Sequence, residues 1–426
     1  MLGNRDFRVL LAARLASQLG EGAFLAVVLD TVVFLPESQS SLRGFALATV
    51  LTLLPFSLLE PFAGVFVDRW PRRPILVTLP LVRAGAALLM IPGLAAVAVY
   101  AGTLVVFSAN RLFQATSSAV IPRVLGAADE PEPERAPLDG DESGPQPRPS
   151  DDSLLFSANL IAAVAGTVAL FGGLLAGGVL AGESGTPVAI ALTWVAWAAS
   201  SVLSARLSSA LPPRKPATGA LRGRLAAVAG DLADGFRRIA GTPAALAPIL
   251  TVAAGQFLQM LAVATTLVVI TESLGAGLVT FSGFVAVGGV GVFVGFLTAG
   301  PMRARLTNEL LIGVAFVLSG LALLPAVVAL GAVTLTIGAV FLGASYGWTR
   351  VPADTLAQRA LPDRYRGRVF TAIDLGFNTA RVLGALAAVI VVPLLGPQTT
   401  FAVVAVLFLL WAPVTPLWLA RGRGMS

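Results

Sequence analysis

Long apolar stretches recur along the whole of this sequence, and each is long enough to cross a lipid bilayer. A transmembrane helix needs about 20 apolar residues, because the hydrocarbon core is about 30 Å thick and a helix rises about 1.5 Å per residue. About twelve stretches reach that length, so the sequence predicts an all-α membrane protein with twelve transmembrane helices. They lie near residues 9–34, 44–66, 74–96, 101–122, 154–180, 187–209, 245–271, 278–299, 309–330, 332–352, 370–393 and 399–419.

The composition supports this prediction and excludes other classes of protein. Of the 426 residues, 56% are hydrophobic and 12% are charged, which is more apolar surface than a soluble core can bury. The chain has no Cys and no His, so it can form neither disulfides nor the usual zinc sites, and it has no histidine proton relay. Any proton carrier is therefore expected to be a carboxylate.

Basic residues are distributed unevenly between the loops. The net charge is +6, and the Lys and Arg outside the apolar stretches lie on one side of the predicted spans, except for Arg43. Loops rich in Lys and Arg stay in the cytoplasm, so both termini are expected there, and the charge is a topology signal that does not indicate a nucleic-acid partner. The preference for Arg over Lys is typical of GC-rich coding, and the expected location is a bacterial inner (plasma) membrane.

Two longer connections divide the chain. Residues 127–150 are rich in Pro, Asp, Glu and Gly and cannot build a core, so we expect a disordered cytoplasmic insertion. Apolar residues recur every three to four positions over 221–239, with Arg and Asp between them, which predicts an amphipathic helix on the inner membrane surface. The expected domains are an N-terminal six-helix bundle (1–210), a cytoplasmic linker (211–244) and a C-terminal six-helix bundle (245–426).

A charged turn with the sequence G-V-F-V-D-R-W-P-R-R ends the second apolar stretch. Gly64 allows close backbone approach, and Asp68 can accept hydrogen bonds from helix N-terminal amides or from an arginine. Arg69, Arg72 and Arg73 hold the turn outside the bilayer. The spacing resembles the signature between the second and third helices of the major facilitator superfamily, although a proline replaces its second glycine.

This resemblance implies both a fold and a mechanism. It implies two six-helix bundles that rock about a central binding site, with the charged turn as a conformational switch. Glycines in the stretch 154–180 let helices pack closely, and they resemble the glycine-rich signature of exporters and antiporters. These helix-packing glycines are Gly166, Gly173, Gly177 and Gly178.

Two further segments resemble the drug and siderophore exporter branch of the superfamily. The sequence N-R-L-F-Q-A, which begins at Asn110, is similar to an arginine motif that is associated with proton coupling in related transporters. The loop expected from Arg350 to Phe370 contains the Gln-Arg and Gly-Arg pairs of that branch. The resemblance covers nearly the whole chain apart from the insertion 127–150.

Several polar residues lie inside apolar stretches, where each must be paired, neutral or hydrated. Asp374, Asn378 and Arg381 share one helical face, and they can line a polar cavity or pair with one another. Asp354 lies near an expected helix end, where contact with water gives it a mainly structural role. The candidates for the proton-coupling or substrate cavity are Glu21, Arg111, Glu60, Arg83, Asp374, Asn378 and Arg381.

Glu21 is the leading candidate for proton coupling. It lies 12 residues beyond the start of its stretch, about 18 Å deep and close to the midplane of the bilayer. A charged carboxylate there is unstable unless a cation or water reaches it, so Glu21 can serve as a proton switch. Pairing with an arginine such as Arg111 would instead keep it charged. Glu60 and Asp374 are the competing carboxylates.

The predicted function is secondary active transport, with proton-coupled efflux of a small amphipathic compound such as a drug or siderophore by alternating access. The alternatives are a lipid or lysophospholipid transporter and a non-transporting membrane sensor or interaction protein. We expect neither enzymatic activity nor a cofactor, because no nucleophile–base pair, metal cluster or nucleotide-binding loop is evident. The expected partners are a small-molecule substrate, protons and membrane lipids, and the chain is expected to be a monomer.

Overall fold

The chain consists of helices joined by short turns in the part that the computed structural model describes, which is residues 4–34, 41–67, 70–91, 93–125, 149–208, 221–360 and 366–424. The first half contains α1 (Arg5–Val28), which continues as the π-helix η1 (Leu29–Phe34), then α2 (Ser41–Val67), α3 (Arg72–Ala87) with the 3-10 turn η2 (Leu88–Met90), α4 (Ala96–Val124), α5 (Pro149–Ser184) and α6 (Thr186–Ala205).

The second half follows α7 (Leu221–Ala240) and repeats this arrangement. It contains α8 (Pro243–Val268) with the π-helix η3 (Val269–Ser273), α9 (Leu278–Arg303), α10 (Asn308–Val328), α11 (Ala332–Arg359), α12 (Arg366–Leu395) and α13 (Pro397–Gly424).

Twelve of these helices correspond to the twelve predicted stretches. Within the described ranges, 11 helices are long and apolar enough to cross a membrane, and α2 contributes a shorter apolar segment, Ser41–Pro55. The amphipathic α7 is the additional helix, and it covers the segment for which the 3.6-residue periodicity predicts one.

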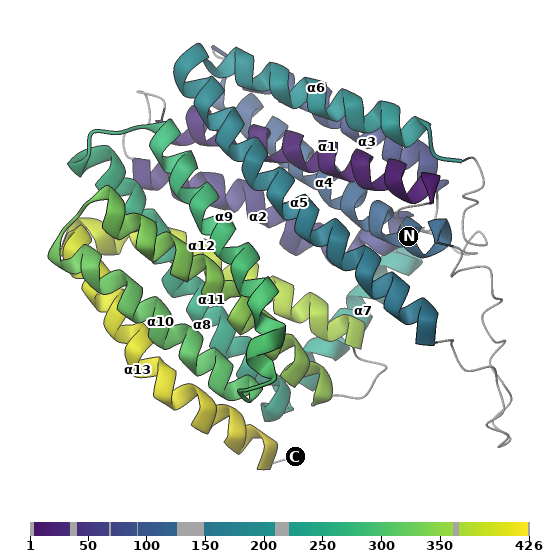
Figure 1. Cartoon of the computed structure of the whole chain (residues 1–426). Helices are drawn as coiled ribbons and strands as arrows, with labels where there is room; N and C mark the ends of the chain where they lie inside the picture. Colours follow the sequence, from purple (N-terminus) through teal and green to yellow (C-terminus); the bar gives the residue numbers. More distant parts are fainter. Residues whose placement is uncertain are drawn as a thin grey trace, which may run out of the picture.

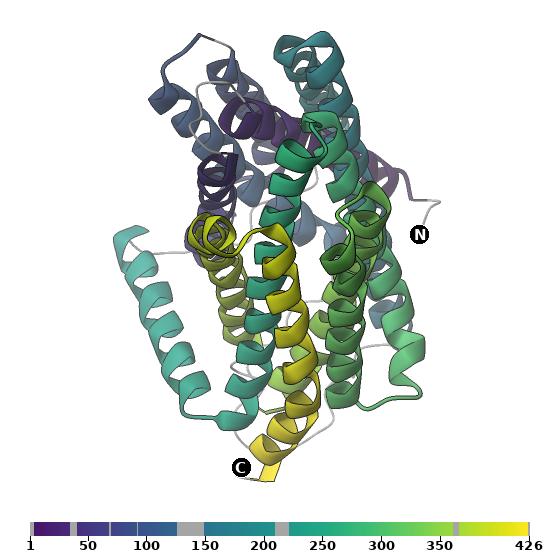
Figure 2. The same cartoon turned by 90° about the vertical axis from the view of Figure 1, so that its left-hand side faces the viewer.

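The membrane helices form two groups, α1–α6 and α8–α13. In the first group α1 packs against α5 and α6, and in the second group α9 packs against α11 and α10 against α13. The groups meet where α5 packs against α9 and where α2 packs against α12. Figure 1 shows the first group in purple to teal and the second in green to yellow, with α5 and α9 side by side at the boundary. In Figure 2, α7 lies beside the two groups and not within either of them.

Glycines set the closest helix contacts. A Cβ atom on Gly22 would overlap the backbone of Leu170, and one on Gly173 would overlap the backbone of Leu19. The facing glycines therefore let α1 and α5 approach to backbone contact, which is how helices gain packing energy in a lipid solvent. Gly291 and Gly343 serve the same purpose between α9 and α11.

Aromatic rings join the two halves at the end of the bundle where α1 finishes and α9 begins. The Phe281 ring of α9 lies 6.2 Å from Phe34 and 5.9 Å from Phe45, measured between ring centroids. We refer to these three residues as the aromatic seam. Close beside it, a Cβ atom on Gly178 of α5 would overlap Ser282 of α9. The two halves are therefore tightly packed at this end.

The structure corrects two predicted boundaries. α5 begins at Pro149, so the last two residues of the predicted insertion 127–150 are helical, and the preceding residues 126–148 lie outside the described part. α11 continues to Arg359, although a loop was expected from Arg350. The helix accommodates Pro352 because a proline costs one backbone hydrogen bond and bends a helix without always ending it.

Candidate functional site

Glu21 is buried in the middle of α1, with only 7% of its surface exposed. The Gln114 side chain of α4 donates a hydrogen bond from Nε2 to Glu21 Oε2 over 3.4 Å. Asn110 of the same helix lies beside the carboxylate, and Arg83 of α3 and Arg111 of α4 are its positively charged neighbours. Arg111, which the sequence analysis named as the alternative partner of Glu21, is therefore one of its electrostatic neighbours, together with Arg83.

Arg83 is completely buried between α1 and α6. Its Nη1 donates to Ser17 Oγ over 2.7 Å, and its guanidinium carbon lies 4.3 Å from the centre of the Trp197 ring. The Trp197 indole donates in turn to the Ser17 carbonyl over 3.2 Å. Cation–π contact and hydrogen bonding together hold Arg83 in one position, and its charge stabilises a negative charge on Glu21.

Arg111 connects the two halves of the molecule electrostatically. It is partly buried in α4, and its charge interacts with Asp374 of α12 as well as with Glu21 of α1. Glu21 and Arg111 belong to the first half, whereas Asp374 belongs to the second. With Arg83, the structure thus brings together four residues that the sequence singled out, across the boundary between the bundles.

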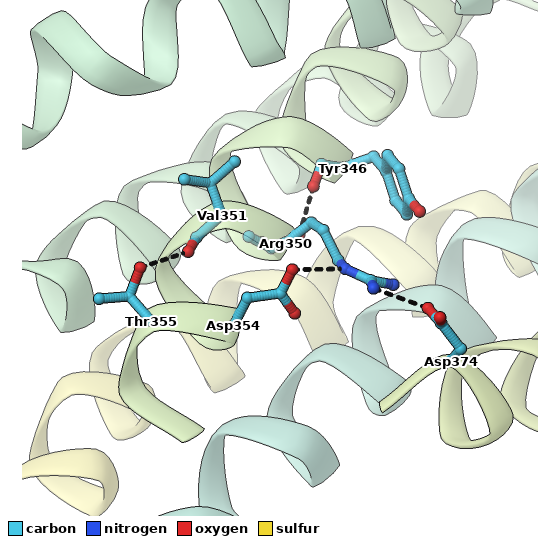
Figure 3. A network of polar contacts seen from close by, with 7 residues as sticks. Tyr346, Arg350, Val351, Asp354, Thr355 and Asp374 are labelled. Carbon is cyan, nitrogen blue, oxygen red and sulfur yellow. Dashed lines mark hydrogen bonds and ion pairs between the residues drawn. The ribbon is translucent and has the colours of Figure 1, made fainter. Parts of the chain in front are cut away.

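Arg350 of α11 is the centre of the charged cluster in the second half, as Figure 3 shows. Its Nε donates to Asp354 Oδ2 over 2.9 Å, and its Nη2 lies 2.6 Å from Asp374 Oδ1 on α12. The guanidinium carbon of Arg350 also lies over the Phe377 ring, 4.5 Å from the ring centre. One arginine therefore neutralises two carboxylates, and it binds α11 to α12.

Neither Arg350 nor Asp354 was among the predicted site residues. Asp354 is expected near a helix end with a mainly structural role; it lies five residues before the end of α11, where it pairs with Arg350. The signal available in the sequence was the spacing of four residues between these opposite charges, which places them on one helical face.

The remaining predicted residues lie along α12 and α2. Asn378 and Arg381 are partly buried in α12, and Asp374 pairs with Arg350 and not with Arg381. Glu60 lies within α2, and its side chain is outside the described part of the structure.

The predicted conformational-switch turn is described in part. Gly64 lies within the last turns of α2, whereas Asp68 and Arg69 lie outside the described residues. Arg72 donates to the Ala119 carbonyl of α4 over 3.2 Å, and Arg73 donates to the Ala205 carbonyl at the end of α6 over 2.5 Å. These two arginines connect α3 to helices of its own half.

The predicted packing glycines lie on two faces of α5. Gly173 and Gly177 face α1, where added Cβ atoms would overlap Leu19 and Ala23, and Gly178 faces Ser282 of α9. Gly166 is covered by the side chain of Gln18. α5 is therefore held closely between α1 of its own half and α9 of the other.

Charges do not balance among the described side chains of the central network. Among the described side chains, the network holds five arginines and three carboxylates, which leaves two positive charges in excess when all are ionised. The arginines are Arg14, Arg83, Arg111, Arg350 and Arg381, and the carboxylates are Glu21, Asp354 and Asp374. Within the described residues, no group of three or more His, Cys, Asp or Glu side chains is arranged to hold a metal ion.

Sequence relatives of the chain are transporters of the MFS type. A family model described as the Major Facilitator Superfamily matches residues 249–424. An uncharacterised MFS-type transporter of Mycobacterium tuberculosis is 37% identical over 125 residues, so the match spans 28% of this chain and only 28% of that relative. The uncharacterised MFS-type transporter YfiS of Bacillus subtilis is 26% identical over 426 residues, covering 96% of this chain and 92% of the relative.

Solved structures with the same fold are transporters as well. A POT family transporter in complex with a thioalcohol-conjugated peptide superposes with a TM-score of 0.73 at 9% identity, covering 98% of this chain and 96% of that one. A mutant of the nucleoside transporter NupG gives a TM-score of 0.67 at 12% identity, covering 97% of this chain and 99% of that one. Identities this low establish the fold alone.

The chain therefore has the twelve-helix major facilitator fold, and the prediction of fold class is confirmed. The family-model match and the relatives support the major facilitator superfamily as its class. Assignment to the drug and siderophore exporter branch stays a prediction from the sequence motifs.

Proposed function

We propose that this chain is a secondary active transporter that moves a small amphipathic compound by alternating access, coupled to protons at Glu21. The observation that carries this proposal is that Arg111 interacts electrostatically both with Glu21 of the first half and with Asp374 of the second. A group shared between two moving bodies can change partners when they move, and the change of partner then depends on the charge of Glu21.

The surroundings of Glu21 are those that a proton switch needs. On its own helix Arg14 interacts with it, α3 contributes Arg83, and α4 contributes Asn110, Arg111 and Gln114. When Glu21 takes up a proton, it no longer attracts Arg83 and Arg111. Asp374 is then the carboxylate with which Arg111 interacts. The proton would thereby strengthen the contact between the two halves.

The direction of transport depends on whether the proton and the substrate compete or bind together. The exporter-like motifs favour antiport, in which substrate leaves as protons enter, and this is the direction that we propose. Proton symport is the second candidate, and the arginine excess favours it, because a proton on Glu21 makes the network more positive and so more attractive to an anionic substrate.

The test is proton movement in proteoliposomes that contain the purified chain and the trapped pH dye pyranine. A panel of amphipathic compounds is added outside at equal pH on both sides. Antiport changes the pH of the lumen in the direction opposite to symport, so one measurement separates the two modes. Absence of any compound-dependent proton movement, with binding intact, would favour the non-transporting alternative.

The matched variants are Glu21→Gln and Glu183→Gln, since Glu183 lies exposed at the end of α5. We expect Glu21→Gln to abolish accumulation driven by a pH gradient while exchange of substrate across the membrane persists. Glu183→Gln should behave as the unmodified protein. Undiminished proton-driven accumulation by Glu21→Gln would exclude Glu21 and direct attention to Glu60 and Asp374.

A further inference from the structure

Arg381 differs from Arg14, Arg83 and Arg350 because, among the described side chains, no hydrogen bond, ion pair or cation–π contact is found for it, whereas each of those three arginines has at least one. It lies near the middle of α12, about 22 Å from the start of that helix. The ion pairs found among the described residues do not include it, and its electrostatic neighbour is Tyr346 of α11. An arginine at this depth is costly without a partner, so its partner is expected to come from outside the chain.

The direction in which Arg381 points follows from the geometry of α12. Asp374 and Arg381 are seven residues apart, which places them about 20° apart around a helix of 3.6 residues per turn. Asp374 faces Arg350 of its own half and interacts with Arg111 of the other half. Arg381 therefore shares the face of α12 that is turned towards the boundary between the bundles.

Arg83 is an example of a structural arginine in this chain, and it can be compared with Arg381. It is completely buried, a serine accepts one of its hydrogen bonds, and its guanidinium is packed against Trp197. Arg381 has no comparable contacts among the described residues, and it is only partly buried. Arg350, the third case, already has two carboxylate partners.

We infer that the transported compound carries an anionic group, a carboxylate or a phosphate, and that the Arg381 guanidinium binds it. A guanidinium recognises either anion through two parallel N–H donors. The two positive charges in excess would be reduced when such a compound enters. The inference rests on the proposed transport function, whose substrate it specifies.

The binding test uses the full chain in nanodiscs of phosphatidylcholine, which has no net charge. The probes are 1-naphthylacetate, 1-naphthyl phosphate, the neutral 1-naphthylacetamide and the cationic 1-naphthylethylamine, which share one apolar ring system. We expect the two acids to raise the melting temperature and the amide and amine to have little effect. We expect the acids to bind about tenfold more weakly to Arg381→Gln, through loss of a charge-assisted hydrogen bond. Arg238→Gln, at an exposed site on α7, is the control and should bind as the unmodified chain does.

A second measurement needs no ligand. Arg381→Met removes an uncompensated cation and should raise the melting temperature of the empty protein, whereas Arg83→Met removes a packed and hydrogen-bonded one and should lower it. Equal losses in both variants would make Arg381 a structural residue and overturn the inference. An equal response to the amine or amide, or the absence of an acid whose binding depends on Arg381, would overturn it as well.

The outcome separates this inference from the proposed function. If the acids bind through Arg381 but move no protons in proteoliposomes, the transport function fails and the anion site stands. If only neutral or cationic compounds move with protons, the function stands and the anion site fails.

Discussion

The ion pair between Arg350 and Asp374 should contribute measurably to stability, because it is short and shielded from water. Its atoms are 2.6 Å apart, and the two side chains are 14% and 29% exposed. A hydrogen bond to a charged group contributes about 1.5–3 kcal/mol. Screening at the partly exposed Asp374 reduces this value, so we expect a coupling energy of about 1–2 kcal/mol.

A double-mutant cycle measures this coupling energy directly. The variants are Arg350→Gln, Asp374→Asn and both together, and the free energy of unfolding is measured in mixed detergent micelles. The control is the pair Arg237–Asp234 on α7, whose atoms are 3.3 Å apart and whose side chains are 81% and 64% exposed. That surface pair should contribute only about 0.2–0.5 kcal/mol. A coupling energy for Arg350 and Asp374 no larger than that of the control would refute the reasoning.

Three further predictions concern other parts of the chain. Replacing residues 127–148 by a short Gly-Ser segment should leave membrane insertion and transport nearly intact, as measured by expression and proteoliposome uptake; loss of either would make the segment structural or regulatory. Asp68→Asn should slow the conformational cycle and leave substrate affinity largely unchanged, so a large affinity loss at an unaltered rate would contradict a switch role. Gly173→Ala should lower stability by about 1–3 kcal/mol, because its Cβ overlaps Leu19. Its neighbour Gly172 has open space around it, so Gly172→Ala should raise stability by about 0.5–1 kcal/mol in the same unfolding assay.

The number of membrane helices could be predicted because it depends on local properties of the sequence. An apolar stretch of about 20 residues must form its backbone hydrogen bonds within itself in lipid, whatever lies elsewhere in the chain. α1 and α9 could each be predicted as membrane helices from their own residues alone. The prediction of a loop from Arg350 was wrong because Arg350 and Asp354 interrupt the apolar stretch in the sequence. In the structure these two side chains form an ion pair, and the helix continues past them.

The composition of the central network could be predicted only in part. The depth of Glu21 and Arg111 follows from their positions in apolar stretches, so both could be singled out. Arg111 could be named as a possible partner of Glu21, but the roles of Arg83 and Asp374 could not be predicted, because Arg83, Arg111 and Asp374 belong to three different helices whose packing is not local. The shared helical face left open whether Asp374 and Arg381 line a polar cavity or pair with each other, and the structure shows that Asp374 forms its ion pair with Arg350 on the neighbouring helix.

The contacts between the two halves are strong enough to define a state and weak enough to be exchanged. Each ring pair of the aromatic seam contributes about 0.5–1.5 kcal/mol beyond its buried area, so the two pairs together contribute about 1–3 kcal/mol. Two conformations of a transporter differ by only a few kcal/mol. If the proposals for Glu21 and Arg381 hold, binding of a proton or an anion there would change the electrostatic energy of the central network, and it would thereby influence whether Phe281 stays in contact with the other half.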